Sequence, residues 1–219
     1  MNTVRKVKTR APRSRDEIIS KQLAWLLRHG AQKEGLSIDS QGYVPVPEVL
    51  AHNKLKSNKT TFEDLQRIVG NDKKQRYTLK SDDDSDPKKS RICANQGHSL
   101  QQIEVELTKL DDSFTDAIIH GTSISAWKLI NESGALSRMT RNHIHFAVDV
   151  PANNNSKVIS GMRNSSNVFI YIDKEKAEKQ GIEFYRSINQ AILSSGNSEG
   201  KIPVECFAKV VDRQGNYLR

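Results

Sequence analysis

The spacing of apolar residues changes along this chain from helix-like to strand-like, and this change limits the possible fold more than any other feature. In residues 16–29 apolar side chains recur every three or four positions and are followed by Gly30, which predicts an amphipathic helix. A turn and short helix are predicted at 42–52, and a third helix at 61–69, where threonines and acidic residues resemble a capping box. The first part of the chain is therefore expected to be helical.

Short strands are predicted after these helices. Residues 76–79 and 91–94 are expected to pair as a hairpin across the polar segment 81–90, and apolar residues alternate again over 103–107. Three helices followed by a hairpin predict an N-terminal winged-helix lobe over residues 16–108.

A hinge is expected at residues 109–113, and the pattern beyond it is mostly strand-like. Strands are predicted at 117–120, 143–148, 168–173, 191–193 and 204–211, and helices at 123–133 and 174–180. A glycine closes each of these helices, at Gly134 and Gly181. Residues 114–219 are therefore expected to form a mixed α/β lobe, which gives the chain an α+β fold with two lobes.

The positive charge is concentrated at one end. The chain has a formal net charge of +8, and residues 1–15 contain six basic residues and no acidic one, which leaves about +2 for the rest. Such a basic tail is expected to be disordered and solvated. Alternatively, the tail could attract phosphates or serve as a nuclear localisation signal.

Several classes of protein do not fit the composition. No apolar run approaches the roughly 18 residues of a membrane span, and no apolar leader follows the basic residues, so no membrane association is expected. Cys93 and Cys206 lie far apart and belong to no CxxC pair, which speaks against a disulfide framework and a thiolate metal site. A reducing location, cytoplasmic or nuclear, is expected.

Some polar residues at the ends of predicted elements could bind a ligand. Arg28 and His29 end the first helix, a position where they usually only complement the helix dipole. Arg76 begins a predicted strand, and taken alone it would be an ordinary surface residue. The HGT segment at 120–122 is expected to leave a strand and enter a helix, which would offer backbone N–H groups to an anion.

The most informative segment is RNHIH at 141–145, because strand alternation would place Arg141, His143 and His145 on one face. With His120 these histidines could form an open zinc site. Alternatively, they could contact an organic ligand whose phosphates Arg141 binds. Arg141 favours the second interpretation, because a cation beside a zinc ion is unfavourable, so no metal is expected.

Seven motifs together resemble the tRNA 2′-phosphotransferase family. They are LLRH (26–29), DSQGY (39–43), QRY (75–77), QGHS (96–99), HGT (120–122), RNHIH (141–145) and SGMR (160–163). Each motif is weak alone, but their order matches throughout residues 16–211. Phe146 and Ala147 depart from the family's frequent Leu-Ser at that place.

The resemblance implies an enzyme with a winged-helix lobe, an ADP-ribosyltransferase-like lobe that binds NAD, and an active site between them. It implies that the 2′-phosphate of spliced tRNA attacks NAD and expels nicotinamide. The neighbouring ribose hydroxyl would then attack the phosphorus, which releases 2′-hydroxyl RNA and ADP-ribose 1″,2″-cyclic phosphate. Neither ionised phosphate nor departing nicotinamide needs a proton in the first step, so arginines suffice there.

By resemblance, the phosphate-handling residues are Arg28, His29, Arg76 and Arg141, and His29 could protonate the leaving RNA oxygen. His120, Gly121, Thr122 and His145 are implied as contacts to NAD, and a monomer is expected. Two rival functions remain open: an ADP-ribosyltransferase that stops after the first step, and a non-catalytic RNA-binding protein. The segment 187–195 contains no acidic residue, whereas a protein-modifying ADP-ribosyltransferase would be expected to have a glutamate near there.

Overall fold

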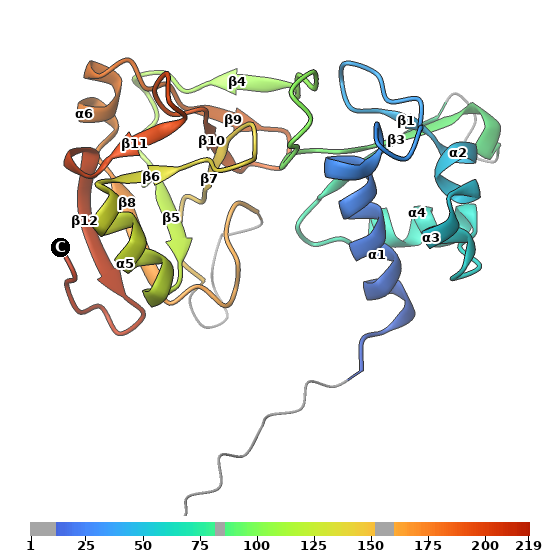
Figure 1. Cartoon of the computed structure of the whole chain (residues 1–219), viewed down its shortest axis with the longest axis horizontal. Helices are drawn as coiled ribbons and strands as arrows, with labels where there is room; N and C mark the ends of the chain where they lie inside the picture. Colours follow the sequence, from blue (N-terminus) through green and yellow to red (C-terminus); the bar gives the residue numbers. More distant parts are fainter. Residues whose placement is uncertain (1–11, 82–85, 152–159) are drawn as a thin grey trace, which may run out of the picture.

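Two large hydrophobic cores organise the described residues, and a small third cluster lies around Ile119, Ala147, Met162 and Phe169. The computed structural model describes residues 12–81, 86–151 and 160–219. One core is built from buried side chains between Ile19 and Ala94, and the other from buried side chains between Leu110 and Val210. In Figure 1 the elements around these cores form two groups side by side. They are called the N-terminal part (residues 12–94) and the C-terminal part (residues 107–219) below.

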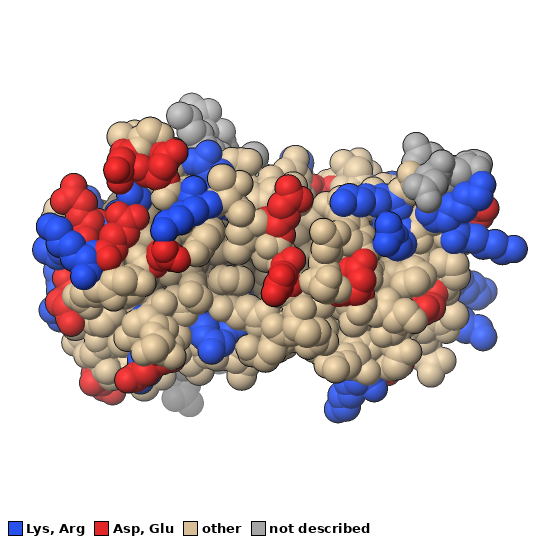
Figure 2. Space-filling view, turned by 90° about the horizontal axis from the view of Figure 1, so that it is seen from above, with Lys and Arg blue, Asp and Glu red and all other residues tan. Residues whose placement is uncertain are grey.

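Charged side chains on the outer surface are mixed. Figure 2 shows Lys and Arg side chains interspersed with Asp and Glu side chains and with uncharged residues on the face that it draws. This face therefore has no continuous basic surface of the kind that binds nucleic acid by charge alone.

The N-terminal part contains short helices and a small antiparallel sheet. Its helices are α1 (Arg15–Trp25), the π-helical turn η1 (Leu26–Gly30), α2 (Val46–Ala51), α3 (Asn53–Lys56), α4 (Phe62–Gly70) and the 3-10 turn η2 (Pro87–Lys89). The strands β1 (Val44–Pro45), β2 (Tyr77–Ser81) and β3 (Ser90–Ala94) pair in the order β1-β3-β2. The predicted first and third helices and the predicted hairpin are thus confirmed.

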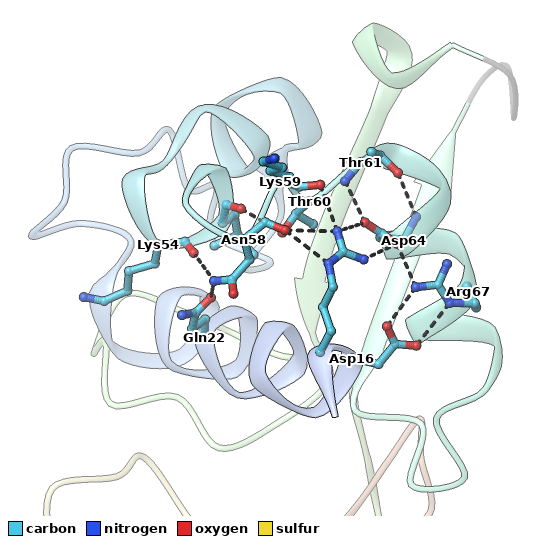
Figure 3. A network of polar contacts seen from close by, with 11 residues as sticks. Asp16, Gln22, Lys54, Asn58, Lys59, Thr60, Thr61, Asp64 and Arg67 are labelled. Atoms are coloured by element: carbon cyan, nitrogen blue, oxygen red, sulfur yellow. Dashed lines mark hydrogen bonds and ion pairs between the residues drawn. The ribbon is translucent and has the colours of Figure 1, made fainter. Parts of the chain in front are cut away.

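A polar network joins the beginnings of α1 and α4 (Figure 3). Thr61 and Asp64 form the predicted capping box at the start of α4. The Asp64 carboxylate also accepts hydrogen bonds from Arg15, at 2.6 and 2.9 Å, and from Arg67, at 2.7 Å. Arg67 in turn pairs with Asp16 in the first turn of α1. The two helices are therefore fixed to each other by charge as well as by the core.

The C-terminal part contains three small antiparallel sheets and two helices. The strands are β4 (Leu107–Lys109), β5 (Ile119–Thr122), β6 (Ala135–Ser137), β7 (Ile144–Phe146), β8 (Val168–Ile172), β9 (Tyr185–Ser187), β10 (Ile192–Ser194), β11 (Lys201–Pro203) and β12 (Phe207–Asp212). They pair in the orders β4-β9-β10-β7, β11-β6 and β12-β8-β5. The helices are α5 (Ile124–Ser133) and α6 (Lys174–Lys179), and the 3-10 turn η3 (Val204–Cys206) precedes β12.

Several predicted elements need correction. The strand expected over 103–107 is wrong, because only Leu107 belongs to a strand and residues 103–106 have no regular structure. There the backbone makes an isolated bond, from Glu104 N to the Ser40 carbonyl oxygen at 2.8 Å, instead of a ladder. The strands β6, β9 and β11 were not predicted. None of the helices in the described residues is long and apolar enough to cross a membrane.

The segment between the two parts, residues 95–106, is bonded to both and is called the connecting segment below. On one side, Ser99 N donates to the carbonyl oxygen of Arg28 at 3.0 Å. On the other side, the side chain of Asn142 donates to the carbonyl oxygen of Leu100 at 2.9 Å. These bonds fix the backbone near Arg28 relative to the turn that carries Arg141.

Candidate active site

A cavity of about 430 Å³ lies between the two parts and contains most of the predicted site residues. The predicted residues in its wall are Arg28, Arg76, His120, Gly121, Thr122, Arg141 and His145. Two come from the N-terminal part and five from the C-terminal part, so the site exists only when the two parts are together.

The wall of this cavity is positively charged. Lys74 and Arg163 join the arginines at positions 28, 76 and 141, and none of the described residues in the wall is acidic. Five cations in one wall repel one another unless an anion lies between them, and Asp72, which is not a wall residue, pairs with Arg76. The cavity is therefore suited to a ligand with several negative charges.

Arg28 has a donor group in this wall that is unpaired within the described parts of the chain. Its Nε is buried and has no hydrogen-bond partner among the described residues. Burial lowers the pKa of Arg28, and Arg141 and Arg76 lower it further. Gly97 has a φ of +87° and packs against Arg28, since a Cβ there would lie 3.4 Å from Nε. A buried donor without a partner marks a place where a ligand oxygen can bind.

Arg76, in contrast, is oriented by a carboxylate that the sequence did not single out. Its backbone N donates to Asp72 Oδ2 at 2.7 Å, and its guanidinium forms an ion pair with Asp72 Oδ1. One edge of the guanidinium is thus occupied by Asp72, which leaves the other edge for a ligand.

Arg141 lies in a turn before β7 rather than in a strand. Its backbone N donates to the Arg138 carbonyl oxygen at 3.2 Å, and its own carbonyl oxygen accepts from Arg138 Nη1 at 2.6 Å. Because β7 begins only at Ile144, strand alternation is the wrong reason for grouping Arg141, His143 and His145. Burial and then Arg163 lower the pKa of Arg141.

The two histidines of the wall are neutral near pH 7. His120 Nδ1 lies 2.9 Å from the His145 carbonyl oxygen, which can only accept, so Nδ1 carries the proton and Nε2 is an acceptor. Burial lowers the pKa of both imidazoles, and Arg141 lowers that of His145 further. They can therefore bind ligand hydroxyls without adding positive charge.

The HGT segment is in the cavity and, as predicted, ends a strand and leads into a helix. Residues 120–122 belong to β5 and pair with β8, and only the N-cap Ser123 separates them from α5. Gly121 is required by packing, because a Cβ there would lie 2.4 Å from Cγ of Met162. Two of the first amides of α5 are already bonded, Ile124 N to Asn167 and Ala126 N to Ser123, so these two are not free for an anion.

His29 is adjacent to the cavity but not among its wall residues. Its Nδ1 and the Ser99 Oγ in the connecting segment are 2.9 Å apart. Burial lowers the pKa of His29, and the charges of Arg141 and Arg28 lower it further. The structure thus brings seven of the eight predicted residues into the wall and places the eighth beside it.

Other residues of the wall were not predicted as site residues. Lys74 donates through Nζ to the Met162 carbonyl oxygen at 2.7 Å, which ties the loop before β2 to the C-terminal part. Gln96, Ser160 and Arg163 also face the cavity. All three belong to the motifs QGHS (96–99) and SGMR (160–163), so the motifs could have predicted them as site residues. In the residues that the structure describes, no three His, Cys, Asp or Glu side chains are grouped closely enough to hold a metal ion.

Two further cavities adjoin the first. One, of about 750 Å³, shares Arg141, His145 and Arg163 with it and continues to the apolar side chains of Leu129 and Met139. The other, of about 760 Å³, shares Arg28 and Arg76 and lies along α1. The cationic cavity thus has an apolar neighbour on one side and an open groove on the other.

These features define an enzyme site that handles anionic substrates in a chain of two parts, and comparison with known proteins identifies the family. The sequence model described as RNA 2′-phosphotransferase, Tpt1/KptA family, matches residues 14–196. The chain therefore belongs to this family, and it is an enzyme of the transferase class.

Individual relatives agree with this assignment. The tRNA 2′-phosphotransferase of Saccharomyces cerevisiae is 43% identical over 205 residues, which covers 90% of this chain and 84% of the relative. The tRNA 2′-phosphotransferase 1 of Danio rerio is 40% identical over 197 residues and covers 89% and 84%. A more distant relative is a probable RNA 2′-phosphotransferase of Rhizobium johnstonii, 29% identical over 191 residues, with coverage of 87% and 92%.

Proposed function

We propose that this enzyme transfers the internal 2′-phosphate of spliced tRNA to NAD. The products would be RNA with a 2′-hydroxyl, nicotinamide and ADP-ribose 1″,2″-cyclic phosphate. The observation that carries the proposal is the cavity with five cations and no acidic residue in its described wall, in a chain of the RNA 2′-phosphotransferase family.

The charges of the cavity match the charges of the two substrates. The RNA 2′-phosphate and the pyrophosphate of NAD must lie close together, and each repels the other. Arg28, Arg76 and Arg141 would hold the 2′-phosphate, since guanidinium groups bind phosphate oxygens through paired hydrogen bonds. Arg163, another cation of the wall, would remain for the pyrophosphate.

Neutral groups in the wall fit the remaining parts of NAD. His120 Nε2 can accept a hydrogen bond from a ribose hydroxyl, because Nδ1 is bonded to the His145 carbonyl oxygen. The apolar cavity beside Met139 offers space for an aromatic ring. We propose His120, Gly121, Thr122 and His145 as the contacts to NAD, with Gly121 acting through its backbone.

The RNA would approach from the other side of the arginines. The groove along α1 shares Arg28 and Arg76 with the cationic cavity, and the rest of its wall contains Arg13 and Lys21 together with the acidic residues Asp16, Glu17 and Asp72. An RNA strand in this groove could present a 2′-phosphate to both arginines while NAD occupies the C-terminal part.

The reaction needs little acid–base chemistry in its first step. The ionised phosphate oxygen forms a bond to C1″ of the nicotinamide ribose, and the C1″–N bond breaks so that neutral nicotinamide leaves. In the second step the 2″-hydroxyl attacks the phosphorus and the bond to the RNA 2′-oxygen breaks. The 2″-hydroxyl loses a proton in this step and the RNA 2′-oxygen must gain one, which the protonated form of His29 would supply.

The remaining expectations stay part of the proposal. Residues 16–108 would be a winged-helix lobe that binds the RNA phosphate, and 114–219 an ADP-ribosyltransferase-like lobe that binds NAD. Residues 1–11 lie outside the described residues, and we propose only solvation for the basic residues there. Arg15, which was expected to belong to the tail, is instead the first residue of α1 and pairs with Asp64. A monomer in the cytoplasm or nucleus is the expected state.

The test is to incubate the protein with an RNA that carries one internal 2′-phosphate, with and without NAD, and to resolve RNA and nucleotide products. Loss of the phosphate that depends on NAD, with formation of the cyclic phosphate, is expected. An ADP-ribose adduct without cyclic phosphate would favour a one-step ADP-ribosyltransferase. Absence of any product would contradict catalysis and leave a binding protein.

Variants of the arginines test the site. Arg28→Ala, Arg76→Ala and Arg141→Ala should each lower kcat about a hundredfold or more, as loss of one group that stabilises transition-state charge does. Arg213→Ala, an exposed arginine in the turn after β12, is the matched control and should retain activity. Turnover close to wild type in all three cavity variants would contradict the site.

A further inference from the structure

Asn189 is a completely buried amide in the turn between β9 and β10, at the junction of the two parts. Its side chain is 0% exposed. The turn is closed by backbone bonds from Ser187 N to Ala191 O at 3.0 Å and from Gln190 N to Ser187 O at 2.9 Å. Asn189 therefore has a fixed backbone and no access to solvent.

The amide nitrogen of Asn189 points at the loop that carries Arg76. Nδ2 lies 3.1 Å from the carbonyl oxygen of Gln75 and 3.2 Å from that of Lys74. Lys74 and Arg76 are both cations of the cavity wall. Asn189, in the C-terminal part, thus binds the backbone segment of the N-terminal part that carries Lys74 and Arg76.

That loop needs such support because its backbone is strained. Gln75, directly before Arg76, has a φ of +46°, which a residue with a side chain adopts at a cost. Its carbonyl oxygen accepts a second bond from Asn95 Nδ2 at 2.7 Å. Two side-chain amides, one from each side of the junction, therefore fix the conformation that places Arg76.

The rest of the Asn189 side chain is bonded to the cavity wall. Oδ1 accepts from Ser187 Oγ at 2.8 Å and from Gln96 Nε2 at 3.2 Å, and Nδ2 lies 3.1 Å from Ser160 Oγ. Gln96 and Ser160 line the cavity. Donors and acceptors around Asn189 thus match an amide and would not match a carboxylate, which cannot donate to two carbonyl oxygens.

We propose that Asn189 is a positioning residue for phosphate transfer, which holds the Lys74–Arg76 backbone so that the Arg76 guanidinium faces the phosphate. The inference rests on the proposed function, since it assigns Arg76 to the phosphate. It also gives a reason for the lack of an acidic residue in the turn: a carboxylate at this place would lose the donor and put negative charge beneath the phosphate site.

The first experiment compares two changes from amide to carboxylate at neighbouring positions. Asn189→Asp keeps the shape of the side chain and should lower kcat about a hundredfold, the loss expected from a small displacement of a catalytic group, while the KM for NAD changes little. Gln190→Glu is the matched control, because Gln190 is exposed, and it should stay within about twofold of wild type. Equal activity of Asn189→Asp and wild type would overturn the proposal.

A second variant separates position from charge. Asn189→Ala adds no charge and should lower kcat in the same direction. Combined with Arg76→Lys in single-turnover reactions, it should cost much less than it does in the wild-type background, because both changes act through the same group. An equal loss in both backgrounds would overturn the role of Asn189 in positioning Arg76.

Hydrogen exchange of the loop gives a readout that does not depend on activity. The backbone amides of Gln75 and Arg76 are bonded to Asp72, so a peptide over residues 72–77 should exchange faster in Asn189→Ala than in wild type. If Asn189→Ala exchanges faster but the wild-type protein removes no 2′-phosphate, the proposed function is refuted while the anchoring of the loop by Asn189 still stands. Unchanged exchange, or faster exchange with unchanged turnover, would overturn the positioning role.

Discussion

Arg28 and Arg76 have different surroundings although both face the same cavity. Arg28 Nε is buried without a hydrogen-bond partner among the described residues, whereas Asp72 holds one edge of Arg76. An arginine with an open donor gains most when an anion binds, and an arginine oriented beforehand loses little freedom on binding. The site thus combines one uncompensated cation with one fixed cation, and both favour phosphate.

His29 is expected to make the second step of the reaction depend on pH. Burial, Arg141 and Arg28 all lower its pKa below the usual value of 6.5, so the free enzyme holds it mostly neutral at pH 7.5. If protonated His29 donates to the RNA oxygen, the second step should become faster as the pH falls from 7.5 towards 6. His29→Asn should remove this dependence and slow the step about a hundredfold.

The measurement is a single-turnover reaction at several pH values in which the RNA species are separated. Because the first step needs no proton, His29→Asn should accumulate the 2′-phospho-ADP-ribosylated RNA. Direct conversion to product at the wild-type rate would show that His29 is not the acid. A slower first step instead would mean that it binds the phosphate.

At the scale of elements, α1 and α4 depend on one carboxylate. Asp64 caps α4 and accepts hydrogen bonds from Arg15 in α1 and from Arg67. The Arg15 guanidinium, followed by the Thr61 backbone and Arg67, holds the pKa of Asp64 well below its usual range. Since α1 leads directly into the turn of Arg28, this clamp supports the site from a distance.

Asp64→Asn should therefore lower the free energy of unfolding by about 2 kcal/mol at pH 7, as loss of charge-assisted hydrogen bonds does. Because the folded pKa is the lower one, the contribution of Asp64 is present above the unfolded value of about 3.9 and is lost as the pH falls below it. Urea denaturation should show the difference from wild type narrowing below about pH 4. Glu63→Gln, on the exposed neighbour, is the control and should shift stability by less than about 0.5 kcal/mol. A gap that widens on acidification would contradict this assignment.

At the scale of the whole molecule, the site lies between two cores that are held together by few polar contacts. The connecting segment is bonded to the Arg28 backbone and to Asn142, and Asn189 joins the loop of Arg76. The chain has two tryptophans, Trp25 beside the first core and Trp127 in the second. Each core therefore has its own fluorescent probe.

Asn142→Ala should uncouple the two cores. It leaves the partly buried Leu100 carbonyl oxygen without its side-chain donor, and the loss of such a hydrogen bond costs about 1 kcal/mol. Versions with Trp25→Phe or Trp127→Phe should unfold in urea at the same midpoint when Asn142 is present and at separate midpoints when it is replaced. Asn131→Ala, an exposed asparagine of α5, is the control. Coincident transitions in Asn142→Ala would show that other contacts couple the parts.

Local patterns in the sequence predicted the longer helices, and the motifs predicted the candidate site residues. Helices α1, α4 and α5 were predicted because apolar spacing, capping threonines and Gly134 act within a few residues of one another. The motifs identified the family, and with it seven residues that the structure brings into one wall. Residue chemistry alone also favoured a phosphate ligand over a metal.

Tertiary structure alone decided how these residues are held. Strands of three residues such as β6, β9 and β11 have too little sequence for a period of two to be visible. The pairs β6–β11 and β4–β9 also join segments that lie far apart along the chain. Three contacts could not be predicted from sequence patterns: the packing of Met162 against Gly121, the ion pair of Asp72 with Arg76, and the hydrogen bond of the buried Asn189 to Gln75, 114 positions away. A sequence pattern reports hydrogen bonds and packing between near neighbours, whereas contacts between distant segments form only when both cores are folded.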